Sequence, residues 1–448
     1  MLPSQRFFAE AASSGRGRGG RGRGASNGGA PLATGGRGGR GQKQPVEAPP
    51  LAADDFPPLG GGGPSAAGAS SGSWASIVGG GASTSAPPLP SLRFASYNVL
   101  AQSLLAGNAQ NYGTCAADAL RAELRLPRVL AAAVALDADV VGMQEVEDFE
   151  DVFVPTLAAH GYRGAYKQRT GAEKTDGCAL FWRHETLELE HLEAIEMRSL
   201  AEGVTPADEA QRLRKDNVAL LGVFRERRSG RRVVVGCLHV LWNPSRGLVK
   251  LRQIQRYTRR AAALAAAAGA AVVLLGDFNC TPRSELYGFL VDGALAAELS
   301  GEDGWDGQQP TWTKKSRAKG GGGERWIEEE HALRGRLRSA YVAARGAEPP
   351  ATSWHQGFRG TVDYVLFEAA ALRPTALLPT PGWATLESLG GALPTDAHPS
   401  DHVPVAADLA WVADAPAAPE GAPALPPPEP GVIAATAAMV GGDGAIVL

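Results

Sequence analysis

The sequence predicts one large α/β sandwich domain flanked by two low-complexity arms. Short runs of β-branched residues and leucines, typical of strands buried on both faces, alternate with segments of helical apolar spacing. Several strands follow one another without a helix between them, which disfavours a TIM barrel or a Rossmann fold. Once the arms are set aside, about 320 residues remain, enough for one domain with a sizeable core.

The first arm, residues 1–90, is rich in glycine and basic at its start. Residues 1–43 hold eight basic residues against one acid, so they carry +7 and the remainder carries −10 of the chain's net −3. Residues 15–24 read GRGRGGRGRG and residues 35–41 read GGRGGRG, a composition that cannot bury enough apolar surface to fold. Arginine stacks on bases and pairs with phosphates, so we expect a disordered, RNA-contacting arm, with a solvated linker as the alternative.

Two short apolar peptides interrupt this arm. One contains Phe56 and Leu59, and the other is the segment 74–78, which begins with Trp74. Isolated apolar clusters in a disordered arm are candidate docking peptides for a protein partner, or they are incidental.

The composition also bears on where the protein works. No run of eighteen apolar residues occurs, so no membrane span is expected. The four cysteines are scattered without a C-x-x-C pair, which favours a reducing compartment over disulfides or a zinc site. The arginine bias of the first forty residues is also compatible with a transit peptide, but the RGG segments explain it. We therefore expect a cytoplasmic protein, with the nucleus or an organelle left open.

The elements of the domain are expected in the following order. The predicted strands are residues 94–100, 140–145, 179–182, 218–224, 233–239, 272–275, 361–367 and 403–409, with Gly276 ending the run at 272–275. Helices are predicted at residues 120–136, where Pro127 kinks the helix or delays its start, and at residues 249–268. Residues 301–325 are expected to form a surface insertion, and the Ala- and Pro-rich residues 413–448 a disordered tail.

Polar residues of related chemistry stand at the ends of these strands. They are Asn98, Gln144, Glu145, His239, Asp277, Asn279, Asp363, Asp401 and His402. Taken alone, Asp277 and Asn279 favour an ordinary turn, although a strand that continued to Asn279 would aim both side chains from one side. Groups gathered at one edge of a sheet commonly form the site. Hard oxygen donors with two imidazoles and no thiolate favour Mg²⁺ or Mn²⁺ over zinc.

These residues lie in segments that resemble the ordered motif set of the endonuclease/exonuclease/phosphatase superfamily. The segments are SYNVLAQ (96–102), MQEVE (143–147), DGCALF (176–181), GDFN (276–279), TVDY (361–364) and PSDH (399–402). Within the superfamily, the chain resembles the branch of carbon-catabolite-repressor deadenylases, nocturnin and angel proteins, and residues 161–171 resemble plant members. The resemblance covers about residues 93–409 and implies a catalytic domain at 91–412 with a DNase I-like, four-layer α/β sandwich.

The resemblance also implies roles for the site residues. Glu145 would be the principal Mg²⁺ ligand, helped by Asn98 and Asp401. Asp277 and Asn279 would position or deprotonate the attacking water and hold the scissile phosphate. His402, oriented by Asp363, and His239 would neutralise charge on the phosphoryl oxygens. Hydrolysis of a phosphodiester needs these functions in any family.

Two loops bear on the substrate. Residues 239–244 read HVLWNP, which resembles the His-x-x-Trp-Asp-Pro of deadenylases with Asn243 in place of Asp. In nocturnin-like relatives that respond to NADPH, basic residues occupy this place, and here only Arg169 and Lys167 could supply charge from elsewhere. Pro244 and Phe358 would sandwich an adenine, with Trp242 and Arg169 as further substrate contacts. The alternative is that Pro244 and Phe358 only pack their loops.

The expected function is a Mg²⁺-dependent 3′-exoribonuclease of the deadenylase type, which shortens mRNA poly(A) tails and releases 5′-AMP. One alternative is a phosphatase or phosphodiesterase acting on NADPH or on 2′,5′-oligoadenylate. Another is an RNA-binding adaptor built on an inactive domain. No leucine-rich repeat, of the kind that tethers some family members to a larger deadenylase assembly, precedes residue 91, so docking is expected to use other surfaces. The RGG arm could contact RNA directly.

Overall fold

The computed structural model describes residues 75–76, 91–299, 325–388, 392–412 and 425. The RGG segments, the peptide with Phe56 and Leu59, nearly all of the predicted insertion and nearly all of the C-terminal tail lie outside the described residues. Among the helices that are described, none combines the length and the hydropathy needed to cross a bilayer.

The first sheet has seven strands and carries one parallel pair. Its order is β1–β16–β17–β2–β3–β5–β4. The bounds are β1 Ala75–Ser76, β16 Leu372–Leu377, β17 Val405–Trp411, β2 Ser91–Asn98, β3 Val140–Val146, β5 Gly177–Arg183 and β4 Tyr162–Gln168. Strands β2 and β3 are parallel, and the other neighbours are antiparallel.

The second sheet has six strands in the order β12–β15–β9–β8–β7–β6. The bounds are β12 Leu337–Ser339, β15 Asp363–Glu368, β9 Ala271–Asp277, β8 Arg232–His239, β7 Val218–Glu226 and β6 Leu187–Glu196. Strands β8 and β9 are the parallel pair here. Each sheet is therefore mixed, and the carboxyl ends of its two parallel strands point to one edge.

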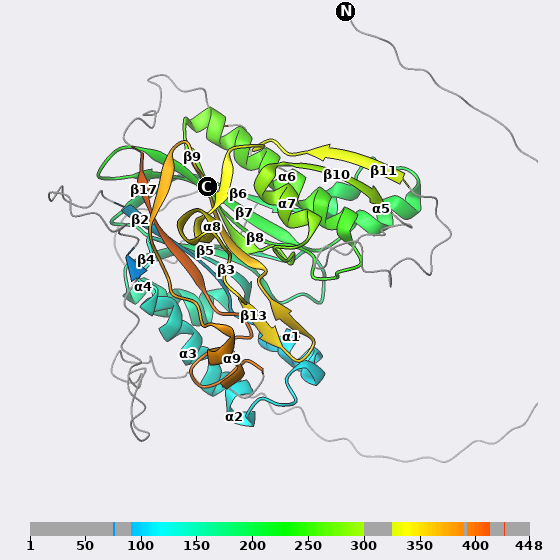
Figure 1. Ribbon diagram of the computed structural model, residues 1–448. Helices are drawn as coiled ribbons and strands as arrows, with labels where there is room; N and C mark the ends of the chain where they lie inside the picture. Colours follow the sequence, from blue (N-terminus) through cyan, green and yellow to red (C-terminus); the bar gives the residue numbers. More distant parts are fainter. Residues whose placement is uncertain (1–74, 77–90, 300–324, 389–391, 413–424, 426–448) are drawn as a thin grey trace, which may run out of the picture. The chain divides into compact units, whose positions relative to one another are not determined.

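The two sheets pack face to face, with helices on both outer surfaces. One core cluster joins the sheets through residues such as Leu180, Val235, Leu275 and Val405. The first sheet is covered by α3 (Ala122–Ala135) and α4 (Val154–Ala159), and the second by α6 (Gly247–Ala268) and α7 (Glu285–Asp292). Figure 1 shows these helix pairs on opposite sides of the strands. The predicted four-layer sandwich is confirmed.

Strand β9 is buried on both faces, as its run of aliphatic residues predicts. Val272 and Leu274 pack with the helix-side cluster, whereas Val273 and Leu275 pack between the sheets. The strand runs two residues beyond Leu275 and ends at Asp277, so it does not continue to Asn279. Asn279 has a φ of +49°, which places it in a left-handed turn rather than in the strand alternation.

Other predicted bounds also changed. Helix α3 begins at Ala122 and runs through Pro127, so the proline does not delay its start. The arm was expected to be disordered through residue 90, but Ala75 and Ser76 form β1, which adds antiparallel to the edge strand β16. Backbone pairing to an unfilled sheet edge can order so short a segment without any apolar side chain.

Many short elements were not predicted from sequence. Besides β1, β4, β6, β12, β16, α4 and α7, they are α1 Gln102–Gly107, α2 Ala117–Leu120, α5 Ala207–Leu213, α8 Ala340–Arg345, α9 Trp383–Ser388, β10 Ala294–Leu299, β11 Arg325–Glu330, β13 Ser353–His355 and β14 Phe358–Gly360. Most are shorter than the window over which periodicity can be recognised. The hairpin β13–β14 matters for function because Trp354 N donates a hydrogen bond to Asp401 O, which ties the hairpin to the site.

Candidate functional site

Sheet register brings the strand-end residues together around Asp277. Asp277 pairs with His239 across β8 and with Asp363 across β15. On the facing sheet, Asn98 ends β2 beside the end of β3. The carboxyl ends of both parallel pairs therefore meet at one edge of the sandwich.

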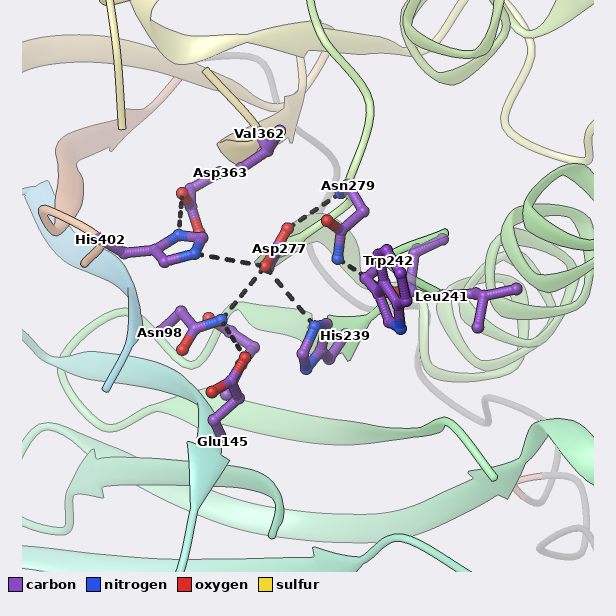
Figure 2. A network of polar contacts seen from close by, with 12 residues as sticks. Asn98, Glu145, His239, Leu241, Trp242, Asp277, Asn279, Val362, Asp363 and His402 are labelled. Carbon is purple, nitrogen blue, oxygen red and sulfur yellow. Dashed lines mark hydrogen bonds and ion pairs between the residues drawn. The ribbon is translucent and has the colours of Figure 1, made fainter. Parts of the chain in front are cut away.

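Asp277 is the centre of a polar network (Figure 2). Asn98 Nδ2 donates a hydrogen bond to Asp277 Oδ2 at 3.1 Å, and the Nε2 atoms of His239 and His402 lie 3.6 Å and 3.8 Å from the same oxygen. The other oxygen, Oδ1, accepts the backbone N–H of Asn279 at 2.9 Å. Burial, together with the charge of Asp363, raises the pKa of Asp277 to about 7.

The two imidazoles near Asp277 differ in charge. His402 Nδ1 lies 2.8 Å from Asp363 Oδ2, and although burial lowers the pKa of His402, the charge and hydrogen bond of Asp363 raise it well above the ordinary value. Burial, with help from Arg169 and His402, lowers the pKa of His239 to about 3. His239 is thus neutral at pH 7, and its contact with Asp277 is not an ion pair. The role of both imidazoles in neutralising charge stays a prediction, and the lowered pKa of His239 favours a hydrogen bond from that ring.

Glu145 reaches the site through a β-bulge. The register between β3 and β5 shifts between Gln144 and Val146, and Glu145 has a φ of +61°. The neighbouring Gln144 points inward instead, where its Nε2 donates to Ser96 Oγ at 3.2 Å. Glu145 accepts hydrogen bonds from Asn98 Nδ2 at 3.0 Å and from Ala101 N at 3.1 Å.

Asn279 is fixed by its turn. Its Nδ2 donates to Val240 O at 3.0 Å, in addition to the backbone hydrogen bond to Asp277. Only its side-chain oxygen remains to receive a donor from a substrate or a water.

Asp401 lies at the same edge, ahead of β17. Tyr112 Oη donates to Asp401 Oδ2 at 2.9 Å, whereas Asp401 Oδ1 is buried without a hydrogen-bond partner. Ser400 Oγ donates to Asn98 O at 2.7 Å and so links the Asp401 loop to the end of β2. A buried carboxylate oxygen without a donor is costly unless a cation satisfies it.

The donor set at this edge fits a hard divalent cation. Glu145 and Asp401 are neighbouring carboxylates, and burial, followed by the charge of Asp401, raises the pKa of Glu145 to about 7. A cation would relieve this repulsion and would satisfy Asp401 Oδ1. Asn98 fits less directly, since its Oδ1 accepts Leu100 N at 3.0 Å and its Nδ2 faces the carboxylates.

A second group of possible ligands lies within the same network. Single atoms of Asp277, Asp363 and His402 fall within 4.8 Å of one another. Asp363 Oδ2 lies against the His402 ring nitrogen, whereas Asp363 Oδ1 is buried without a hydrogen-bond partner, as Asp401 Oδ1 is. Both groups therefore offer an oxygen to a cation, and the placement of the metal on Glu145 and Asp401 stays a prediction.

The predicted substrate residues lie on two separate loops. Trp242 and Pro244 follow β8, and the Trp242 side chain is 65% exposed. Phe358 begins β14 and lies 6.3 Å from the His355 ring, on the Asp401 side of the site. No contact between Pro244 and Phe358 is established, so the adenine sandwich stays a prediction.

Arg169 lies beside His239, whose pKa its charge helps to lower. Its Nη1 is 3.3 Å from Asp176 Oδ1, and its buried Nε has no hydrogen-bond partner. A guanidinium with an unused donor next to the network suits an incoming phosphate oxygen.

Three residues near the site were not recognised in the sequence. Tyr112 carries no local signal. Arg125 and Lys250 are fully buried on α3 and α6. Both occupy apolar helix faces, Arg125 four residues before Val129 and Lys250 four residues before Ile254, and this spacing could have revealed them.

Comparisons with known proteins agree with this geometry. Residues 95–402 match the Endonuclease/Exonuclease/phosphatase family model. Carbon catabolite repressor protein 4 homolog 3 of Arabidopsis thaliana is 31% identical, over 71% of this chain and 75% of its own length. 2′,5′-Phosphodiesterase 12 of Bos taurus is 27% identical, over 71% of this chain and 52% of its own length.

A solved structure supports the same family assignment. The crystal structure of ANGEL2, a 2′,3′-cyclic phosphatase, in complex with adenosine-2′,3′-vanadate superposes with a TM-score of 0.65 at 26% identity, covering 77% of this chain and 99% of that chain. These matches confirm the resemblance found in the sequence motifs. The chain belongs to the endonuclease/exonuclease/phosphatase family, among relatives of the carbon catabolite repressor 4 and angel type.

Proposed function

We propose that the chain is a Mg²⁺-dependent phosphodiesterase that acts as a 3′-exoribonuclease of the deadenylase type on poly(A). The observation that most supports this proposal is the set of charged and polar groups around Asp277. A carboxylate with a pKa of about 7 lies within 4 Å of two imidazoles of opposite protonation preference. A base of this pKa suits deprotonation of water near neutral pH.

Each residue of the network would have its own role in the reaction. Asp277 would take a proton from a water, whose oxygen attacks the phosphorus of the terminal nucleotide, with Asn279 Oδ1 orienting that water. The bond between phosphorus and the 3′-oxygen of the shortened chain would break, and 5′-AMP would leave. His402, kept charged by Asp363, would stabilise the phosphoryl oxygens, while the neutral His239 would donate a hydrogen bond.

Glu145 and Asp401, with Asn98 beside them, would hold the metal. When bound, Mg²⁺ or Mn²⁺ would supply charge neutralisation at the phosphoryl group. The raised pKa of Glu145 and the buried oxygen of Asp401 without a donor support this placement.

Two observations favour adenylate RNA as substrate. Trp242 offers an exposed ring next to the network, and stacking of a base on such a ring contributes about 1–3 kcal/mol. A further relative, the CCR4-Not complex 3′-5′-exoribonuclease subunit Ccr4 of Mycosarcoma maydis, is 26% identical over 69% of this chain and 49% of its own length. The basic arm of residues 1–43 would bind a further stretch of the RNA.

A second candidate is hydrolysis of a 2′,5′-linked or 2′,3′-cyclic phosphoester. It is favoured by the similarity to 2′,5′-phosphodiesterase 12 and to ANGEL2, together with Arg169, whose free donor could bind a further phosphate. Removal of the 2′-phosphate of NADPH, which is a monoester, is the phosphatase form of this second candidate. The inactive-adaptor alternative is disfavoured because all eight predicted metal and catalytic residues are present and gather at one edge.

The test offers full-length protein poly(A), poly(U), 2′,5′-oligoadenylate, an oligonucleotide ending in a 2′,3′-cyclic phosphate, and NADPH. Each is incubated with Mg²⁺ and with EDTA. Release of 5′-AMP from poly(A), absent in EDTA, is the expected result. Phosphate release from NADPH or from the cyclic end, with poly(A) intact, would replace the deadenylase proposal by the second candidate.

Two variants complete the test. Glu145→Ala should abolish turnover while the circular dichroism spectrum and the melting temperature stay close to those of the wild type; activity that persisted would refute the metal assignment. Deletion of residues 1–43 should weaken RNA affinity and flatten its salt dependence, because up to eight basic residues are lost.

A further inference from the structure

Lys250 is a buried cation that bridges two functional segments. It lies on α6, its side chain is fully buried, and its Nζ donates a hydrogen bond to Asn279 O at 2.8 Å. The same nitrogen lies 3.4 Å from Trp242 O and donates to it as well. One ammonium group therefore holds the turn that follows β9 and the loop that follows β8.

The two segments that Lys250 joins carry different parts of the site. Trp242 presents an exposed ring, and Asn279 sits in the turn beside Asp277. Figure 2 shows Trp242 on the Asn279 side of Asp277, away from His402. A second link runs between the same segments, because Asn279 Nδ2 donates to Val240 O at 3.0 Å.

A lysine at this position is not explained by packing alone. Removing an ammonium from water is costly, and an apolar side chain would fill the same space without that cost. What the apolar side chain lacks is a donor for two carbonyls on different segments. Asn279 also has a positive φ, a conformation that persists only where its surroundings enforce it, and the hydrogen bond to Lys250 is one such restraint.

We propose that Lys250 is a positioning residue that couples base contact at Trp242 to the alignment of Asn279 with the scissile phosphate. The inference rests on the proposed function, in which Trp242 binds a base and Asn279 handles the phosphate or the attacking water. Binding energy from the contact with the base would then lower the barrier of the chemical step. A substrate without its base would therefore lose kcat as well as affinity.

The experiment compares wild type, Lys250→Met and a matched control, Arg260→Met. Arg260 is a second shielded cation on α6, and it pairs with Glu193 away from the site. Each protein is given oligoadenylate and the same oligomer with an abasic 3′-terminal nucleotide. Wild type and Arg260→Met should show a kcat on oligoadenylate that is at least about fivefold above that on the abasic oligomer. In Lys250→Met this ratio should approach one.

Hydrogen exchange measured by mass spectrometry provides a readout that does not depend on activity. In Lys250→Met, amide exchange should rise together in residues 241–246 and 279–282, and in neither segment of Arg260→Met. Lys250→Gln, which keeps a shorter donor, should give an intermediate ratio and serves if the methionine variant does not fold.

Two outcomes overturn the proposal: an unchanged kcat ratio in Lys250→Met, or increased exchange in only one of the two segments. If no protein turns over either oligomer, the deadenylase proposal fails instead. The exchange data then decide alone whether Lys250 couples the segments.

Discussion

Replacement of Arg125 by methionine should strongly destabilise the fold. Arg125 is fully buried on α3, and its guanidinium donates to Val99 O at 2.8 Å, Leu100 O at 2.6 Å and Pro399 O at 3.1 Å. It also binds Gln102 Oε1. These bonds join the segment after β2, which follows Asn98, to the segment that precedes Asp401.

The expected magnitude follows from the carbonyls that lose their donor. A buried acceptor left unsatisfied costs about 1–3 kcal/mol, so three of them cost about 3–9 kcal/mol. Relaxation of the two loops and entry of water favour the lower end, and we expect a loss of about 3–5 kcal/mol. This is a large part of the roughly 5–15 kcal/mol by which domains are stable.

The assay is equilibrium urea unfolding followed by tryptophan fluorescence and by circular dichroism. The control is Arg128→Met on the same helix, where Arg128 pairs with Asp396 at 2.7 Å and the two side chains are 29% and 74% exposed. Such an exposed pair contributes about 0–1 kcal/mol. A loss below about 1 kcal/mol for Arg125→Met, or one equal to that of the control, would refute the argument that this cation holds the loops.

Three further predictions concern the active site. Asp363→Asn should lower the pKa of His402, so the activity that needs the imidazolium disappears at lower pH than in wild type, as measured by the pH profile of kcat/KM. Gly276→Ala should prevent soluble expression or lower the melting temperature sharply, because the new Cβ would lie 2.3 Å from a backbone oxygen of β8. The control is Gly107→Ala, whose Cβ would meet nothing within 4 Å and which should leave the melting temperature unchanged. In EDTA the melting temperature should rise as pH falls from 8 to 6.5, because folding raises the pKa of both Glu145 and Asp277 to about 7 and the native state takes up protons there. Saturating Mg²⁺ should reduce this slope by the share that belongs to Glu145.

The strands at the centre of the fold could be predicted from the sequence because their signal is local. Runs such as residues 272–275 are aliphatic enough to indicate strands buried on both faces, and the polar residues that follow them identify the edge where the site forms. The edge strand β6 was missed because its alternation LELE breaks after Glu190, where a bulge between Leu189 and His191 shifts the register. Strand β1 could not be predicted, since it exists only by pairing with β16, about 300 residues further along the chain.

The positions of the site residues depend on backbone geometry that sequence periodicity cannot express. In a regular strand, Gln144 and Glu145 would lie on opposite faces, and the sequence does not show which of the two faces the site. In the structure a β-bulge directs Glu145 to the site. The residue types of Asp277 and Asn279 favoured a turn, and Asn279 does lie in a left-handed turn, but the sequence could not show that this turn places it beside Asp277. The buried cations were missed for a related reason, because their partners are carbonyls on distant segments.

The residues with positive φ at the site are held in part by the two buried cations, Arg125 and Lys250. In the described chain, the non-glycine residues with positive φ include Leu100, Glu145 and Asn279, all at the site. Each such conformation costs about 1–3 kcal/mol and persists only where its surroundings enforce it. The carbonyl of Leu100 is held by Arg125 and that of Asn279 by Lys250, while Glu145 lies in the β-bulge between β3 and β5. Both cations hold the turns that aim the site, and Arg125 also interacts electrostatically with the carboxylates of Asp401 and Glu145, so it offsets part of their charge.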